Sequence, residues 1–225
     1  MKNIILILLT FVCGEIFSQD WPIAPEVWSE PILLDSALNV PFDWFDSPSF
    51  AKSMDTLYFT GGNGVFRAVK NIINGKTTWY VTRLNDKVNP PGQMPPISCP
   101  ISRDGKRMYI SYYGGSGYGG RDIWRSDWND TIKDWGTPVN IGPGINTPRG
   151  EVFFYELSRD SAYVLANHTG LVTMYLYTFD NQKNDWAVAD SFTNVYDEFG
   201  RRPFRDADIY GLSLTKDKKK LYLSL

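Results

Sequence analysis

The sequence repeats itself at intervals of about fifty residues, and this repeat limits the possible folds more than any other feature. Four similar stretches each open on a tryptophan, at successive spacings of 51, 56 and 51 residues: Trp28, Trp79, Trp135 and Trp186. Three of them carry an Asn-x-Pro about ten residues further on, beginning at Asn39, Asn89 and Asn146. A period in this range indicates repeated supersecondary units.

A second set of stretches alternates with the first. Each is predicted to form a strand, a tight polar turn and a second strand that contains a mostly apolar triplet with a tyrosine: 57–59, 108–110, 163–165 and 221–223. Asp104-Gly105 is the strongest turn pair, because glycine takes the positive φ that a two-residue hairpin requires. Further strands are predicted at 64–69, 121–126 and 172–178.

Each repeat therefore contains four short antiparallel strands and no helical periodicity. The aromatic content of 15% also favours sheets. This layout predicts an all-β chain folded as a β-propeller of four-stranded antiparallel blades. A β-sandwich can be built from similar strands, but it would not repeat its motifs in a fixed order.

The middle repeat also carries family marks. They are Ser102-x-Asp104-Gly105, a Gly-rich hairpin, Asp122-Ile123-Trp124, and an Ile-Asn-Thr-Pro that is followed by the acidic Glu151. This stretch resembles the WD-like propeller repeat of TolB-type proteins, which also occurs in outer-membrane-associated proteins of the OmpA and peptidoglycan-binding group. The flanking copies match less well, and Asp208 alone repeats the acidic mark.

The predicted blades do not complete a ring. They span residues 48–98, 99–153 and 154–210, followed by a partial blade at 211–225. Residues 20–47 are expected to be an N-terminal strand and linker that closes the last blade. A four-bladed ring with a short closing blade is one interpretation. The apolar edge at 221–223 favours the other, an incomplete, N-terminal portion of a larger ring.

Residues 1–19 are predicted to be a secretory signal peptide. A short basic start precedes an apolar run at 4–12, which is too short to span a bilayer, and Ser18-Gln19 follows. An uncleaved anchor and lipidation at Cys13 are the less favoured alternatives. After cleavage, Cys99 would be the one remaining cysteine, and the mature chain is expected to contain no transmembrane segment. We therefore expect an exported protein, periplasmic or associated with the outer membrane, without an internal disulfide.

Charge and residue counts limit the partners and cofactors. With 23 basic and 25 acidic residues, the chain has no overall positive field, so no nucleic-acid partner is expected. One histidine and one mature cysteine argue against a metal site. The acidic loops at 127–130 and 180–185 lack the central glycine of calcium loops. No metal or other cofactor is predicted.

Motifs for catalysis are weak. The residues Gly115-x-Gly117-x-x-Gly120 match the sequence pattern of a dinucleotide-binding motif. That motif requires a helix directly after the glycines, whereas a strand is predicted here. Nothing in the sequence places His168, the one histidine, beside a serine and an aspartate. The turn at Ser102 also departs from the sialidase pattern. We therefore expect no catalytic residues.

The best candidate for a binding surface is the face where the inter-blade linkers meet the central channel. Its polar residues are Asn146, Arg149, Glu151, Arg201, Arg202 and Asp208. Polar groups on rigid loops suit the binding of a peptide or glycan. The alternative is that these side chains merely hold the linkers by bonding backbone amides.

The family resemblance implies a non-catalytic scaffold that binds a protein or a cell-wall (peptidoglycan or glycan) partner. A second hypothesis is that the propeller is the substrate-binding domain of a longer hydrolase, either prolyl-oligopeptidase-like or glycan-processing. A glycan-processing propeller would place two carboxylates opposite each other, about 5–10 Å apart.

Overall fold

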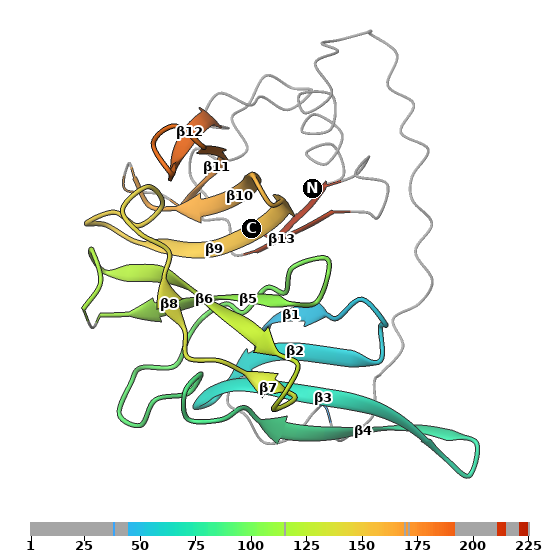
Figure 1. The fold of residues 1–225 in the computed structure, drawn as a ribbon. Coiled ribbons are helices and arrows are strands. Elements are labelled where there is room, and N and C mark those ends of the chain that lie inside the picture. Colours follow the sequence, from blue (N-terminus) through green and yellow to red (C-terminus); the bar gives the residue numbers. More distant parts are fainter. Residues whose placement is uncertain are drawn as a thin grey trace, which may run out of the picture.

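A computed structural model describes residue 38 and residues 45–114, 116–168, 170, 172–191, 211–214 and 221–224. Within these ranges every regular element is a β-strand (Figure 1). The first sheet consists of β1 (Phe45–Phe50), β2 (Thr56–Gly61), β3 (Gly64–Ile73) and β4 (Lys76–Arg83). These strands pair in chain order and are antiparallel throughout.

The second and third sheets follow along the chain. The second consists of β5 (Arg107–Tyr113), β6 (Arg121–Asn129), β7 (Asp134–Trp135) and β8 (Val139–Asn140). The third consists of β9 (Glu151–Ser158), β10 (Ser161–Ala166), β11 (Thr173–Asp180) and β12 (Asp185–Ser191). A terminal pair follows, β13 (Gly211–Leu214) with β14 (Leu221–Ser224).

The second sheet is less regular than its neighbours at both edges. Its outer edge is divided, because the two-residue strands β7 and β8 both pair with β6. At its inner edge, residues 97–102 run beside β5 without forming a regular strand. The Ser111 amide donates to the Ser98 carbonyl at 3.2 Å and the Tyr109 amide to the Pro100 carbonyl at 2.9 Å. Pro100 has no N–H to return, which explains the broken ladder.

The sheets pack face to face in chain order, and one strand can contribute to two interfaces. In β5, Met108 and Ile110 face the first sheet, whereas Tyr109 faces the third. Successive side chains on a strand point to opposite faces, so the apolar triplets predicted from the sequence supply both neighbours. Tyr163 and Val164 on β10 divide in the same way, between the terminal pair and the second sheet.

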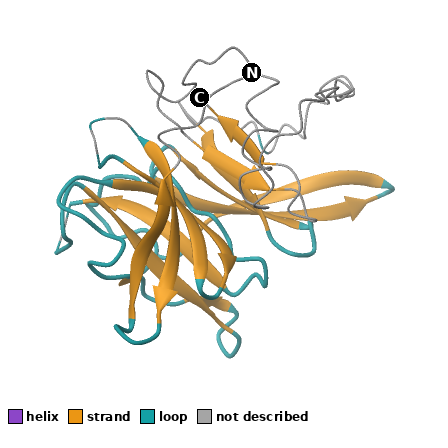
Figure 2. Cartoon of the chain, turned by 90° about the horizontal axis from the view of Figure 1, so that it is seen from above, coloured by secondary structure: helices purple, strands orange, loops and turns teal. Residues whose placement is uncertain are grey.

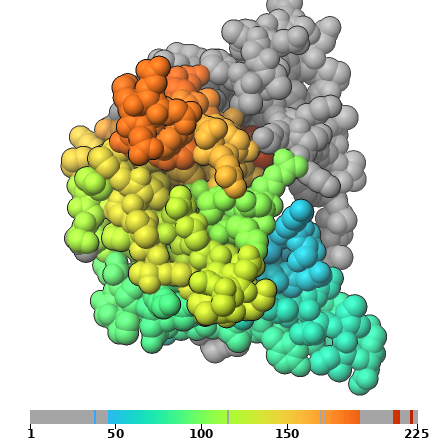
Figure 3. All heavy atoms as spheres, in the orientation of Figure 1, coloured from blue at the N-terminus to red at the C-terminus, as the bar shows by residue number. Residues whose placement is uncertain are grey.

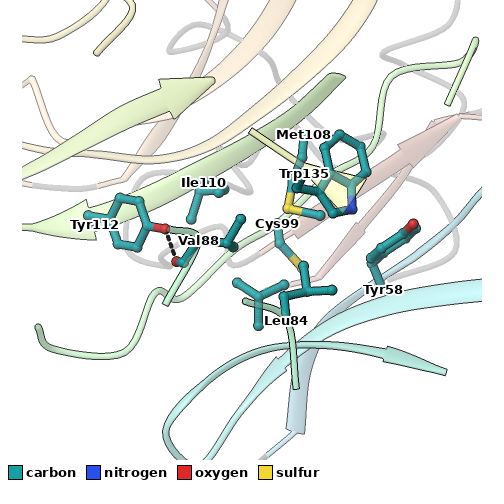
Figure 4. Packing of buried hydrophobic residues seen from close by; sticks show 9 residues of the cluster. Tyr58, Leu84, Val88, Cys99, Met108, Ile110, Tyr112 and Trp135 are labelled. Carbon is teal, nitrogen blue, oxygen red and sulfur yellow. Dashed lines mark hydrogen bonds between the residues drawn. The ribbon is translucent and has the colours of Figure 1, made fainter. Parts of the chain in front are cut away.

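The interface between the first and second sheets is a dense apolar cluster (Figure 4). Its members are Tyr58, Val65, Leu84, Val88, Cys99, Met108, Ile110, Tyr112 and Trp135. The Trp135 ring is fully buried and meets the Tyr58 ring edge-on, with centroids 5.6 Å apart. Trp135, the third of the repeated tryptophans, thus joins two consecutive repeats.

The inner edges of consecutive sheets lie side by side. The Cys99 amide donates to the Ser47 hydroxyl at 3.3 Å, and the Ser98 hydroxyl donates to the Val152 carbonyl at 2.6 Å. Four-stranded antiparallel sheets that stack in order and meet at their inner edges are the blades of a β-propeller. The predicted fold class is therefore confirmed. Trp28 lies outside the described residues.

Candidate binding site

Asn146, one of the predicted site residues, is buried in the linker between the second and third sheets. Its Oδ1 accepts from the Ile123 amide at 2.8 Å, and its Nδ2 donates to the Ile123 carbonyl at 3.0 Å. Asn89 makes the same two bonds to Val65, at 2.7 and 3.1 Å. The repeated asparagine therefore satisfies equivalent backbone groups in two repeats.

Glu151, the acidic residue of the family motif, begins β9 and is fully buried. Its Oε2 accepts from the Thr147 amide at 3.0 Å and its Oε1 from the Thr147 hydroxyl at 2.6 Å. His168 Nε2 lies 3.5 Å from Oε1, and the His168 ring packs on Tyr175 with centroids 4.5 Å apart. Glu151 therefore anchors the linker and lies beside the one histidine.

Arg149 is exposed and belongs to the same linker. Its carbonyl accepts from the Gly120 amide at 3.0 Å, which joins the linker to the glycine-rich loop between β5 and β6. A Cβ at Gly119 would lie 2.2 Å from the Thr147 carbonyl oxygen, so close packing requires glycine there. The linker thus brings together Asn146, Arg149 and Glu151, whereas Arg201, Arg202 and Asp208 lie outside the described residues.

A cleft of about 560 Å³ lies between the second and third sheets. None of its lining residues was singled out from the sequence as a site residue. They are Arg107, Tyr109, Arg125, Asp127, Val139, Asn140, Ile141, Phe154, Glu156, Arg159, Asp160, Phe179, Asn184, Asp185 and Trp186. This volume lies within the range of clefts that hold small ligands or peptide side chains.

The polar part of the cleft is a bonded group of three side chains. Arg107 donates to both carboxylate oxygens of Glu156, from Nε to Oε2 and from Nη2 to Oε1, each at 2.8 Å. The Tyr109 hydroxyl donates to Glu156 Oε2 at 2.5 Å. Burial, followed by this hydrogen bond, raises the pKa of Tyr109. Because Glu156 holds the Arg107 guanidinium in a bidentate bond, the pKa of Arg107 is also raised.

Aromatic rings form the apolar part of the cleft. Tyr109 and Phe154 stack with centroids 4.2 Å apart. Trp186 meets Phe154 and Phe179 edge-on, at 5.6 and 5.5 Å. Trp186 is half-buried, so part of its ring faces the cleft. Trp186, the fourth of the repeated tryptophans, therefore lines a cavity rather than a closed interface.

The rim of the cleft is accessible and carries positively and negatively charged side chains. Val139 on β8 is 66% exposed. Arg125 Nε lies 3.2 Å from Asp127 Oδ1 on the same strand, and both side chains are about half exposed. Arg159 is exposed on the turn between β9 and β10. A partner with apolar and charged groups can therefore reach the aromatic wall past a mixed rim.

Two further features concern metals and membranes. Among the described residues, no group of three or more His, Cys, Asp or Glu side chains is placed to hold a metal ion. The described part of the chain also contains no helix with the length and apolarity needed to cross a bilayer.

Comparisons with known proteins add a distant structural likeness. No protein-family model matches the chain, and a comparison with curated proteins finds no match. Among solved structures, TolB from Acinetobacter baumannii is similar at 14% identity with a TM-score of 0.43. The likeness covers 80% of this chain and 37% of that one, so the chain spans well under half of that protein's length. The propeller fold itself rests on the sheets and their packing.

Proposed function

We propose that the chain is an exported, non-catalytic β-propeller scaffold that binds a protein or cell-wall partner in the periplasm or at the outer membrane. The cleft between the second and third sheets would be the binding site. The observation that carries this proposal is the rigid Arg107–Glu156 pair in the same cleft as the half-buried Trp186. Arginine and tryptophan are the residues most enriched where partners bind tightly.

The bonding within the cleft supports binding over chemistry. Glu156 already accepts three hydrogen bonds, so its carboxylate is held in place. The raised pKa of Tyr109 keeps its hydroxyl protonated as a donor. Preorganised polar groups lower the cost of ordering on association.

The arrangement gives no specific support to the hydrolase hypothesis. His168 and Glu151 lie close together, but neither lines the cleft. The Glu151 carboxylate accepts from Thr147 of the linker, and the His168 ring packs on Tyr175 of β11. They therefore support a role in holding the linker.

Site-specific photo-crosslinking in cells tests the proposal. A photoreactive residue replaces Val139, at the rim of the cleft, in the full chain expressed for export. The control position is Met54, which is 59% exposed on the first sheet, close to the 66% of Val139. We expect a discrete adduct at Val139 and none at Met54. Trp186→Ala should weaken the Val139 adduct.

The nature of the adduct identifies the partner class. Sensitivity to a protease indicates a protein partner, and sensitivity to a peptidoglycan hydrolase indicates the cell wall. Equal adducts at both positions, or a Val139 adduct that Trp186→Ala leaves unchanged, would contradict binding in the cleft.

A further inference from the structure

The β3–β4 hairpin projects from the body of the protein (Figures 2 and 3). Its strands are ten and eight residues long, and they pair from Phe66↔Arg83 out to Ile73↔Lys76. The tip is the two-residue turn Asn74-Gly75, with φ of 51° and 75°. Two positive φ values match the twist of the strands, so the arm is well formed to its end.

The tip is apolar on both of its faces. Ile72 is 72% exposed and Ile73 is 46% exposed. Consecutive residues on a strand point to opposite sides, so the two side chains emerge from opposite faces of the hairpin. A partner with one flat surface would cover only one of them. Immersion of the tip in an apolar medium removes both of them from water.

The arm is also uniformly positive. Residues 64–83 contain Arg67, Lys70, Lys76 and Arg83 and no carboxylate, in a chain that is slightly acidic overall. Arg83 pairs with Asp86 at the base of the arm. Lys70 and Lys76 are exposed near the tip, and neither makes a salt bridge to any described residue. This distribution is complementary to an anionic surface.

We propose that the hairpin tip inserts into the interface of a membrane that carries anionic phosphate headgroups. Ile72 and Ile73 enter the boundary of the acyl chains, and Lys70 and Lys76 bind phosphates. Tyr80, which is 54% exposed and pairs with Val69, lies at headgroup level. The last three residues of β3 span about 10 Å, comparable with the depth that interfacial segments reach.

This inference does not depend on the proposed function. The cleft lies between the second and third sheets, whereas the arm belongs to the first. A membrane contact would orient the scaffold while leaving the cleft accessible. The exposed isoleucines on both faces of the tip, and the lysines without a salt bridge, favour a lipid surface over a protein groove as the partner.

Co-sedimentation with lipid vesicles tests the inference on the full chain, purified after export. We compare vesicles of phosphatidylcholine alone with vesicles that contain about one third phosphatidylglycerol. Binding is expected only to the anionic vesicles and should decrease at high salt. Ile72→Ser with Ile73→Ser should lower partitioning about 10-fold, and Lys70→Gln with Lys76→Gln by a similar factor.

Two controls separate insertion from misfolding or adhesion. The side chains of Lys70, Ile72, Ile73 and Lys76 are exposed, so their substitution should not change the thermal unfolding of the protein. Met54→Ser, an exposed position outside the arm, should keep full binding to the anionic vesicles. An environment-sensitive dye on Ile72→Cys should brighten with anionic vesicles, whereas the same dye on Met54→Cys should not. Trp186→Ala should also keep full binding, which separates this test from that of the cleft.

Three results would overturn the inference. The first is an absence of binding to either kind of vesicle. The second is an equal dye response at Ile72→Cys and Met54→Cys. The third is a specific protein adduct at position 72 without vesicle binding, which would identify a protein groove as the partner of the tip.

Discussion

Arg107 on β5 and Glu156 on β9 form a bidentate ion pair that joins the second sheet to the third. Their side chains are 17% and 7% exposed, so water screens the pair only partly. Removing one partner of such a pair leaves a charge in a poorly hydrated site. The pair is therefore expected to fix how two blades sit against each other and to shape the cleft.

Arg107→Met should lower the free energy of unfolding by about 3 kcal/mol, because Glu156 loses both guanidinium bonds. Urea denaturation measures this change. The control is the double variant Arg107→Met with Glu156→Leu, which removes both charges. It should be more stable than the single variant, and a double variant that is less stable would contradict the account.

The repeated asparagines should have equal structural effects. Asn146→Ala and Asn89→Ala each leave the backbone N–H of a fully buried residue, Ile123 or Val65, without its side-chain acceptor. The carbonyls of Ile123 and Val65 keep one backbone donor each, Ile141 and Leu84. Each substitution should lower the free energy of unfolding by about 1–3 kcal/mol. Equilibrium unfolding of the two variants checks this. A stable Asn146→Ala protein that has lost partner binding would instead assign Asn146 to the binding surface.

The repeat in the sequence predicted the blades because each copy of the repeat folds into one sheet. The Trp strands, the apolar triplets and the turn at Gly105 are local signals, and burial on alternate faces follows from strand periodicity. The cleft could not be predicted from such local signals. Arg107 and Glu156 lie 49 residues apart on different sheets, and no local pattern sets which residues meet across an interface. The sequence identified Trp186 as one of the repeated tryptophans but did not predict that it lines a cleft.

The linker residues illustrate the same limit. Asn146 and Glu151 stood out because polar residues recur in the linkers, and the sequence left open whether they bind a partner or hold the linker. Their hydrogen bonds to Ile123 and Thr147 were not predictable from spacing alone. These bonds use the polar atoms internally, which favours the second interpretation for the two residues.

Cys99 should be inert in the folded protein. The thiol is completely buried between the first two sheets, and this burial raises its pKa. In the full chain with Cys13→Ser, a thiol reagent at neutral pH should react with Cys99 only as fast as the protein unfolds. Fast labelling without denaturant would contradict the packing of this cluster, and labelling in urea is the positive control.

Stability should fall at alkaline pH. Burial raises the pKa of Tyr109, Tyr112 and Tyr177 in the folded state. Below about pH 10 these groups are protonated in both states, so their ionisation does not affect stability. Above that pH the unfolded chain loses its protons first, and each tyrosine lowers the free energy of unfolding by up to about 1.4 kcal/mol per pH unit.

Tyr112→Phe isolates one of these contributions. The Tyr112 hydroxyl donates to the Val88 carbonyl, so the variant should be less stable at neutral pH by about 1–2 kcal/mol. Its stability should then decrease less steeply above about pH 10. Denaturant titrations between pH 7 and about pH 11 compare the two proteins. Parallel pH profiles would show that Tyr112 ionises freely in the folded state.

The central claim is that consecutive repeats form separate sheets that pack face to face in chain order. Nuclear Overhauser effects between aromatic ring protons measure this packing in solution. We predict cross-peaks between Tyr109 and Phe154, whose ring centroids are 4.2 Å apart across the second and third sheets. The assignment is checked by their loss in Phe154→Leu. A folded chain whose Tyr109 ring shows no contact with Phe154 would contradict the stacking and the cleft that depends on it.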